Sequence, residues 1–110
     1  MAGWYAVDFD GTLAVYHGWK GPGIEVMGEP VPVMLARVKR WLAAGHEVRI
    51  FTARASVPEQ IPPVEAWCEK YLGRKLPVTN VKDFGMIELW DDRAVQVIPN
   101  TGEPADQSRA

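Results

Sequence analysis

Short apolar runs alternate with polar clusters along this chain, and three of the runs stop abruptly at acidic or hydroxyl side chains. Runs of this length, rich in Val, Ile and aromatic residues, are typical of buried strands. The strands expected on this ground are 4–7, followed by Asp8 and Asp10, 47–52, ending in Thr52, and 86–90, followed by Asp91 and Asp92.

Apolar residues between the first two strands recur at helical spacing. This predicts a helix that begins at Pro32, because proline is favoured in the first helical turn, and that is closed by Gly45. The prolines within 58–63 are expected to keep the chain irregular up to Val64. A second amphipathic helix should begin there and end at Gly73.

Strands and helices therefore alternate, which predicts an α/β fold with parallel strands joined by right-handed crossovers. Two shorter strands are expected at 76–79 and 94–98. The small polar residues of 100–110 predict a flexible tail after a single domain that spans 1–99. Residues 13–30 are rich in glycine and aromatic residues, so we expect a short flap hairpin beside the acids.

The composition is that of one globular domain, with 110 residues, 47% of them hydrophobic and 24% charged. A net charge of −2 without a basic cluster disfavours nucleic acid as the main partner. Cys68 is the single cysteine, which excludes an internal disulfide, and its place in an apolar stripe predicts a small buried hydrophobe. The sequence has no leader pattern and no run near the roughly 18 apolar residues of a membrane span, so we expect a cytoplasmic protein without a membrane partner.

The acidic clusters define the expected chemistry. Ligands of α/β folds bind beyond the carboxyl ends of the strands, so Asp8, Asp10, Asp91 and Asp92 should share one crevice with Thr52. Four carboxylates held this close repel one another, so we expect a cation among them. Ligands that are oxygen alone select a hard ion, and Mg²⁺ fits because it accepts a few carboxylates, retains water and binds phosphate.

These residues resemble the four motifs of the haloacid dehalogenase-like (HAD) hydrolase superfamily, and together they extend from Val7 to Arg93. The matching segments are, in order, Asp8-Phe9-Asp10-Gly11-Thr12, Ile50-Phe51-Thr52, Lys82 and Leu89-Trp90-Asp91-Asp92. The resemblance implies a three-layer, Rossmann-like parallel sheet with helices on both faces. It also implies a hydrolase, a phosphatase that acts on a small phosphorylated substrate.

The resemblance implies a role for each matching residue. Asp8 would attack phosphorus and form an aspartyl phosphate, while Asp10 would protonate the leaving oxygen and later activate water. The Mg²⁺ ligands would be Asp8, the backbone carbonyl of Asp10, and either Asp91 or Asp92. The phosphoryl group would be held by Thr52, by backbone N–H groups near Ala53 and Arg54, and by Lys82. The Arg54 side chain would contact the substrate or form an ion pair at the surface.

The sequence departs from the family pattern in two ways. Lys82 lies only a short loop before Asp91, so Lys75 is kept as an alternative. No insertion is long enough to form a separate cap domain, so the flap at 16–28 or a neighbouring subunit of a homo-oligomer would cover the site. Within the flap, the residues expected to contact the leaving group are His17, Trp19 and Lys20.

Two other functions use the same residues. One is a catalytically silent binding or regulatory module on the same fold, because fold alone does not establish activity. The other is a nucleic-acid end phosphatase, whose polymer substrate could reach an open site without a cap. A calcium loop starting at Asp8 is excluded, because the sixth and twelfth positions are Leu13 and Trp19.

Overall fold

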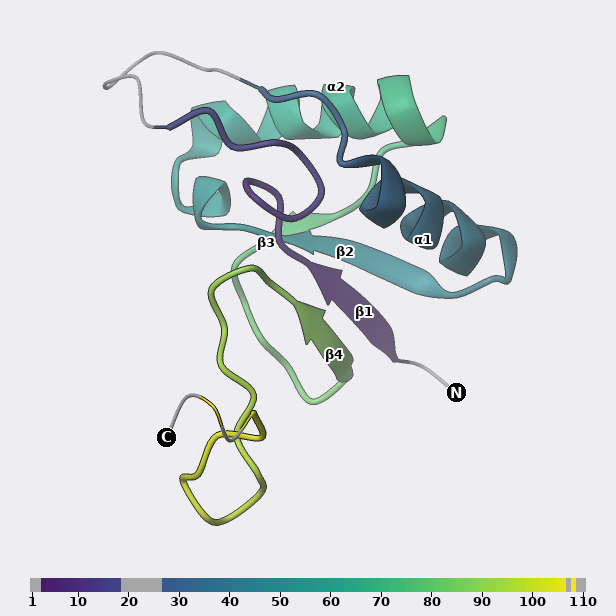
Figure 1. Cartoon of the computed structure of the whole chain (residues 1–110). Helices are drawn as coiled ribbons and strands as arrows, with labels where there is room; N and C mark the ends of the chain where they lie inside the picture. Colours follow the sequence, from purple (N-terminus) through teal and green to yellow (C-terminus); the bar gives the residue numbers. More distant parts are fainter. Residues whose placement is uncertain (1–2, 19–26, 107, 109–110) are drawn as a thin grey trace.

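The computed structural model of the chain describes residues 3–18, 27–106 and 108. Its centre is a four-stranded parallel sheet with the strand order β3-β2-β1-β4 (Figure 1). The strands are β1 (Trp4–Val7), β2 (Glu47–Phe51), β3 (Val78–Thr79) and β4 (Met86–Trp90). The α/β class with a parallel sheet is confirmed, and the described residues contain no separate cap.

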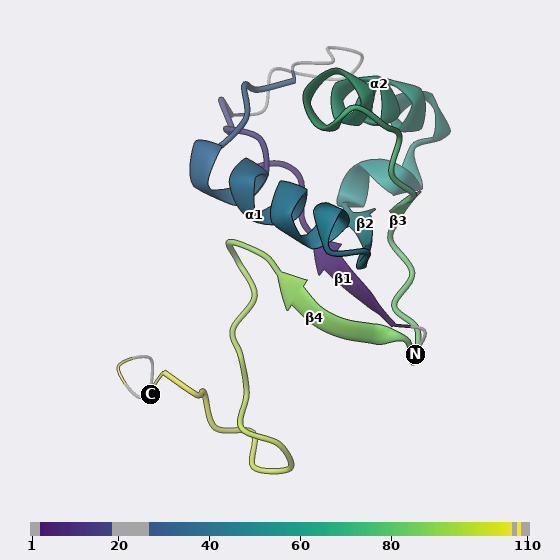
Figure 2. The same ribbon diagram turned by 90° about the vertical axis from the view of Figure 1, so that its right-hand side faces the viewer.

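Both helices, α1 (Pro32–Ala43) and α2 (Ile61–Leu72), lie on the same face of the sheet (Figures 1 and 2). The chain steps from β1 to β2 to β3 in one direction, and two right-handed crossovers in one direction place their helices on one side. The expected second layer of helices is therefore absent from the part of the chain that the structure describes. No described helix combines the length and apolar character needed to cross a membrane.

One apolar core fills the space between the sheet and the two helices. It includes Val7 from β1, Ile50 from β2 and Val38 from α1, all fully buried. Phe9 packs edge-on against Trp67 of α2, with 5.0 Å between the ring centroids. Because Phe9 stands between two acids in the sequence, this contact ties the acidic loop to the core.

The second helix begins earlier than the sequence predicts. Two short 3₁₀ helices, η1 (Ala53–Ser56) and η2 (Pro58–Gln60), lead directly into α2 at Ile61. Pro62 and Pro63 are accommodated because the first N–H groups of a helix have no partner within it. Gly73 ends α2 in the left-handed conformation that the sequence predicts, with φ of 81°.

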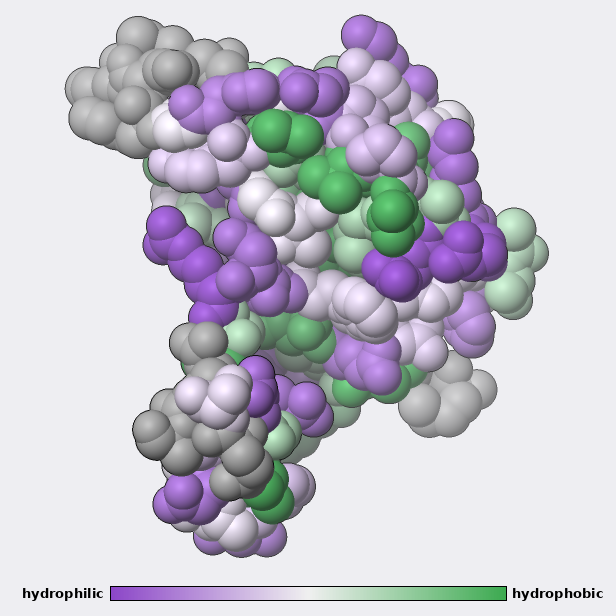
Figure 3. All heavy atoms as spheres, viewed as in Figure 1, coloured by the Kyte–Doolittle hydropathy of each residue, from purple (hydrophilic) through white to green (hydrophobic). Residues whose placement is uncertain are grey.

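The expected strand at 94–98 does not form. The chain after β4 is exposed and leaves the body of the domain (Figures 1 and 2), with one isolated bridge between Val97 and Pro104. A parallel partner for β4 would need a crossover of about a dozen residues, and only the turn at 91–93 is available. In the space-filling view this segment stands as a separate lobe in which polar and apolar residues are mixed (Figure 3).

The base of the expected flap is present as a short antiparallel pairing. The Val15 N–H donates to the Glu29 carbonyl at 2.8 Å, and the Val31 N–H donates to the Leu13 carbonyl at 2.8 Å. Trp67 of α2 reinforces this base, because its Nε1 donates to the Gly28 carbonyl at 2.8 Å. Residues 19–26 lie outside the described residues.

Candidate active site

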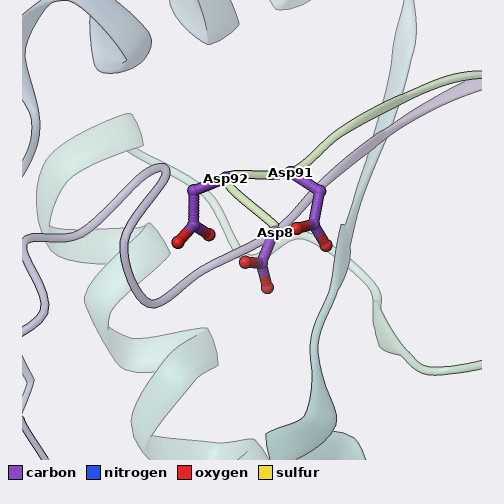
Figure 4. A group of neighbouring side chains, drawn as sticks. All are labelled: Asp8, Asp91 and Asp92. Carbon is purple, nitrogen blue, oxygen red and sulfur yellow. The ribbon is translucent and has the colours of Figure 1, made fainter. Parts of the chain in front are cut away.

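The first and last acidic clusters lie side by side because β1 and β4 are neighbours. The Asp8 N–H donates to the Trp90 carbonyl at 2.9 Å, so the pairing of the two strands continues to the point where the acids begin. Figure 4 shows Asp8, Asp91 and Asp92 converging from the two chain segments. Each offers one carboxylate oxygen, and these oxygens all lie within 4.8 Å of one another.

The turn after β4 holds Asp91 in place. Asp91 Oδ1 accepts the Arg93 N–H at 2.7 Å and the Ala94 N–H at 3.2 Å. This local turn fixes the Asp91 carboxyl group directly after β4, at the position where it meets the other two acids.

Gly11 and Thr12 fix Asp92 against the first acidic loop. Thr12 Oγ1 donates to Asp92 Oδ1 at 3.1 Å and accepts the Asp92 N–H at 3.0 Å. Gly11 has φ of +87°, and a Cβ at this position would lie 2.7 Å from Asp92 Oδ2. The motif requires glycine here for two reasons, a left-handed backbone and the close approach of an acid.

The convergence of acids changes their affinity for protons. Burial, a hydrogen bond with Asp92 and the charge of Asp91 raise the pKa of Asp8 to about 7. Burial also acts to raise the pKa of Asp92, but hydrogen bonds with Asp8 and Thr12 hold it below its ordinary value. The pKa values of Asp8 and Asp92 are thus shifted in opposite directions, as expected for two carboxyl groups that share a site.

The three acids fit a divalent cation. All donors are carboxylate oxygens, which suit Mg²⁺, Ca²⁺ or Mn²⁺ rather than zinc. The raised pKa of Asp8 agrees with this, because three ionised carboxyl groups this close repel one another unless a counter-charge lies among them. The carboxyl group of Asp10 is not a member of this cluster, and the resemblance gives Asp10 a place at the ion through its backbone carbonyl.

An open pocket of about 520 Å³ lies beside the acids. Thr52, at the end of β2, lines it as the sequence predicts, and so does Ala53. Thr52 is 4% exposed, and its Oγ1 accepts the Arg54 N–H at 3.2 Å. That backbone N–H, expected to hold a phosphoryl group, is thus used within the protein.

The structure places Asp10 in the pocket but pairs it with Arg54. Arg54 Nε lies 2.7 Å from Asp10 Oδ2, and Nη2 lies 2.9 Å from Oδ1, so the two groups form a bidentate pair. The side chains are 16% and 26% exposed, respectively. Spacing alone gave no sign of this pair, because the partners are 44 residues apart.

The expected lysine is not in the pocket. Lys82 is exposed on the connection between β3 and β4, and it is not among the described residues that line the pocket. Lys75, the alternative, precedes β3, so it lies towards the amino end of the strands, away from the carboxyl end where the acids lie. The prediction that either lysine contacts the phosphoryl group is thus not met in this structure.

The predicted leaving-group residues have mixed outcomes. His17 is exposed and its Nε2 lies 2.9 Å from Glu29 Oε2, and it does not line the pocket. Trp19 and Lys20 lie outside the described residues. Tyr16, at the base of the flap, does line the pocket.

Besides Tyr16, three pocket residues were not singled out from the sequence. They are Phe51, Asn80 and Arg93. Asn80 follows β3 directly, so the rule that polar residues after parallel strands share one edge would have identified it. Arg93 follows the paired acids and could have been identified in the same way.

Comparisons with known proteins bear on the fold. No protein-family model matches the sequence, and no curated protein matches it. A solved structure of a conserved protein coded by a locus from Bacteroides thetaiotaomicron is similar, with a TM-score of 0.66 and 23% identity. The match covers 91% of this chain and 84% of that chain, and it supports the α/β fold described above.

Proposed function

We propose that the protein is a Mg²⁺-dependent phosphomonoester hydrolase that forms an aspartyl phosphate on Asp8. The observation that carries the proposal is the convergence of Asp8, Asp91 and Asp92 within 4.8 Å at the carboxyl edge of a parallel sheet. The order of the matching motifs and the resemblance to HAD hydrolases support the same conclusion. Asp8 is the proposed nucleophile because it is the first acid after β1 and lines the pocket.

In the first half-reaction, an Asp8 oxygen attacks phosphorus as the bond from phosphorus to the leaving oxygen breaks. The alcohol leaves, and Asp8 carries the phosphoryl group. In the second half-reaction, water attacks phosphorus and the bond to Asp8 breaks, which releases inorganic phosphate. Asp10 lines the same pocket and is the proposed group that exchanges a proton with the alcohol or the water.

Asp8, Asp91 and Asp92 would hold the ion. When bound, Mg²⁺ would neutralise charge on the phosphoryl oxygens so that one anion can approach another. Thr52 and Asn80 line the pocket and offer polar groups to the phosphoryl oxygens.

The test is phosphate release from p-nitrophenyl phosphate and from a panel of small phosphomonoesters, with Mg²⁺ and with a chelator. We expect phosphate release in the presence of Mg²⁺ and none in the presence of the chelator. Mass spectrometry of acid-quenched protein should find a phosphoryl group on Asp8. A folded protein that releases no phosphate from any member of the panel would contradict the proposal and favour a silent binding module.

A further inference from the structure

The guanidinium of Arg54 is directed at Asp10. Its Nε and Nη2 donate to the two Asp10 oxygens at 2.7 and 2.9 Å, which is the parallel arrangement that gives the strongest pairs between arginine and a carboxylate. Asp10 is one of the described residues that line the pocket, whereas Arg54 is not. The pair therefore joins the pocket to the structure behind it.

Other contacts hold the Arg54 side chain where it is. Nη1 donates to Gln60 Oε1 at 3.2 Å, and the guanidinium carbon lies 5.7 Å from the centre of the Phe9 ring. The side chain is 16% exposed. Moving this group onto a substrate would break several contacts at once, including two bonds to a charged partner.

Arg93 is placed differently. Arg93 is an exposed residue that lines the pocket, and its backbone N–H is fixed by Asp91 at 2.7 Å. No described lysine lines the pocket. Among the described residues that line the pocket, Arg93 is thus the one with a cationic side chain.

We propose that Arg54 and Arg93 have different roles in the reaction. Arg54 is a positioning residue that orients the Asp10 carboxylate, and Arg93 binds the anionic phosphoryl group in the place expected for Lys82. This inference rests on the proposed hydrolase function. It gives a positioning role to the Arg54 side chain, for which the sequence leaves open a substrate contact or a surface ion pair.

The test compares Arg54→Met with Arg93→Met, two variants that lose the same charge and keep a similar aliphatic stem. Three quantities are measured with p-nitrophenyl phosphate and Mg²⁺: kcat, KM, and the inhibition constant of inorganic phosphate. For Arg54→Met we expect kcat to fall about 100-fold, because a misplaced proton-transfer group costs about that much, with the phosphate inhibition constant unchanged. For Arg93→Met we expect that constant to rise about tenfold, with a smaller change in kcat.

Gln60→Ala provides a second route if Arg54→Met does not fold. It removes the acceptor of Nη1 and keeps the charge of Arg54, so kcat should fall below the wild-type value by less than about 100-fold, while the phosphate inhibition constant stays at the wild-type value. If phosphate inhibits Arg54→Met or Gln60→Ala more weakly while kcat is retained, the inference is overturned and the proposed function is not. Absence of turnover in the wild-type protein would reject the proposed function and this inference together.

Discussion

Two consecutive residues, the last of β1 and the one that follows it, belong to regions that affect stability in opposite ways. Val7 is fully buried in the apolar core under α1 and α2, whereas Asp8 lies among carboxyl groups at the edge of the same sheet. The core stabilises the fold by removing apolar surface from water. The acidic edge costs stability, because like charges are held together by the pairing of β1 with β4 and by the contact between Thr12 and Asp92. A cation bound among Asp8, Asp91 and Asp92 would offset this repulsion.

The largest expected effect is on kcat, and it should follow from a change in the acidic edge that leaves the apolar core intact. Asp8→Asn removes the proposed nucleophile while keeping the shape of the side chain, so kcat should fall by at least about 10⁴-fold. The thermal transition should remain cooperative, because the core is unchanged. Glu69→Gln, an exposed change on α2, is the control and should leave kcat at its wild-type value. Retention of most of the turnover in Asp8→Asn would remove Asp8 from the mechanism.

The next effect is on the core. Ile50 is fully buried on β2, and Ile50→Ala should lower the free energy of unfolding by about 3 kcal/mol, because it leaves a cavity. Val33→Ala, at a side chain that is 69% exposed, should change it by less than about 0.5 kcal/mol. Chemical denaturation measures both. Equal effects at the two positions would mean that the core is not where the structure places it.

A smaller effect isolates the approach of Asp92 to the first loop. Gly11→Ala and Gly45→Ala both put a side chain at positive φ, 87° and 85°, which costs about 1 to 2 kcal/mol of stability. Only at Gly11 does the new Cβ meet Asp92 Oδ2, at 2.7 Å, while at Gly45 nothing lies within 4 Å. We therefore expect Mg²⁺ binding to weaken in Gly11→Ala and to persist in Gly45→Ala. Equal Mg²⁺ affinity in the two variants would show that this contact does not shape the site.

The smallest expected effect is the pH dependence of the metal-free protein. The pKa of Asp8 is about 7 in the folded protein against an ordinary value of 3.8, so between these pH values the folded state keeps a proton that the unfolded state has lost. The Asp8 contribution to stability is therefore present at low pH and is lost as pH rises towards 7. Because Asp8 is only half-buried, we expect about 1 kcal/mol or less. In Asp8→Asn this component should vanish, so the variant should gain stability relative to wild type as pH rises from 5 to 8; a parallel pH profile would contradict the assignment.

The sequence was sufficient for the parallel direction of the strands, because strands and helices alternate along the chain. It was also sufficient for the meeting of Asp8 with Asp91 and Asp92, which follows from where the apolar runs end. Other features depend on information that local patterns do not contain. The single helical layer depends on the direction in which successive crossovers step, which periodicity does not record. The strand expected at 94–98 failed because an apolar run needs a partner within reach of its connection.

Long-range pairs limited the prediction of the site. The spacing of motifs placed Lys82 in the pocket, but the connection between β3 and β4 leaves it outside. The sequence leaves the Arg54 side chain either a substrate contact or a surface ion pair, and the structure pairs it with Asp10, 44 residues away. The sequence shows which residue types are available for a site, whereas the packing of loops decides which of them meet.

The most direct test of the account is a calorimetric titration of the metal-free protein with Mg²⁺ at pH 8, alongside Asp91→Asn and the control Glu69→Gln. The account predicts one ion per chain for wild type and Glu69→Gln, and an affinity at least about tenfold weaker in Asp91→Asn, because one of three anionic ligands is lost. Absence of binding in the wild-type protein, or equal affinity in all three proteins, would contradict it.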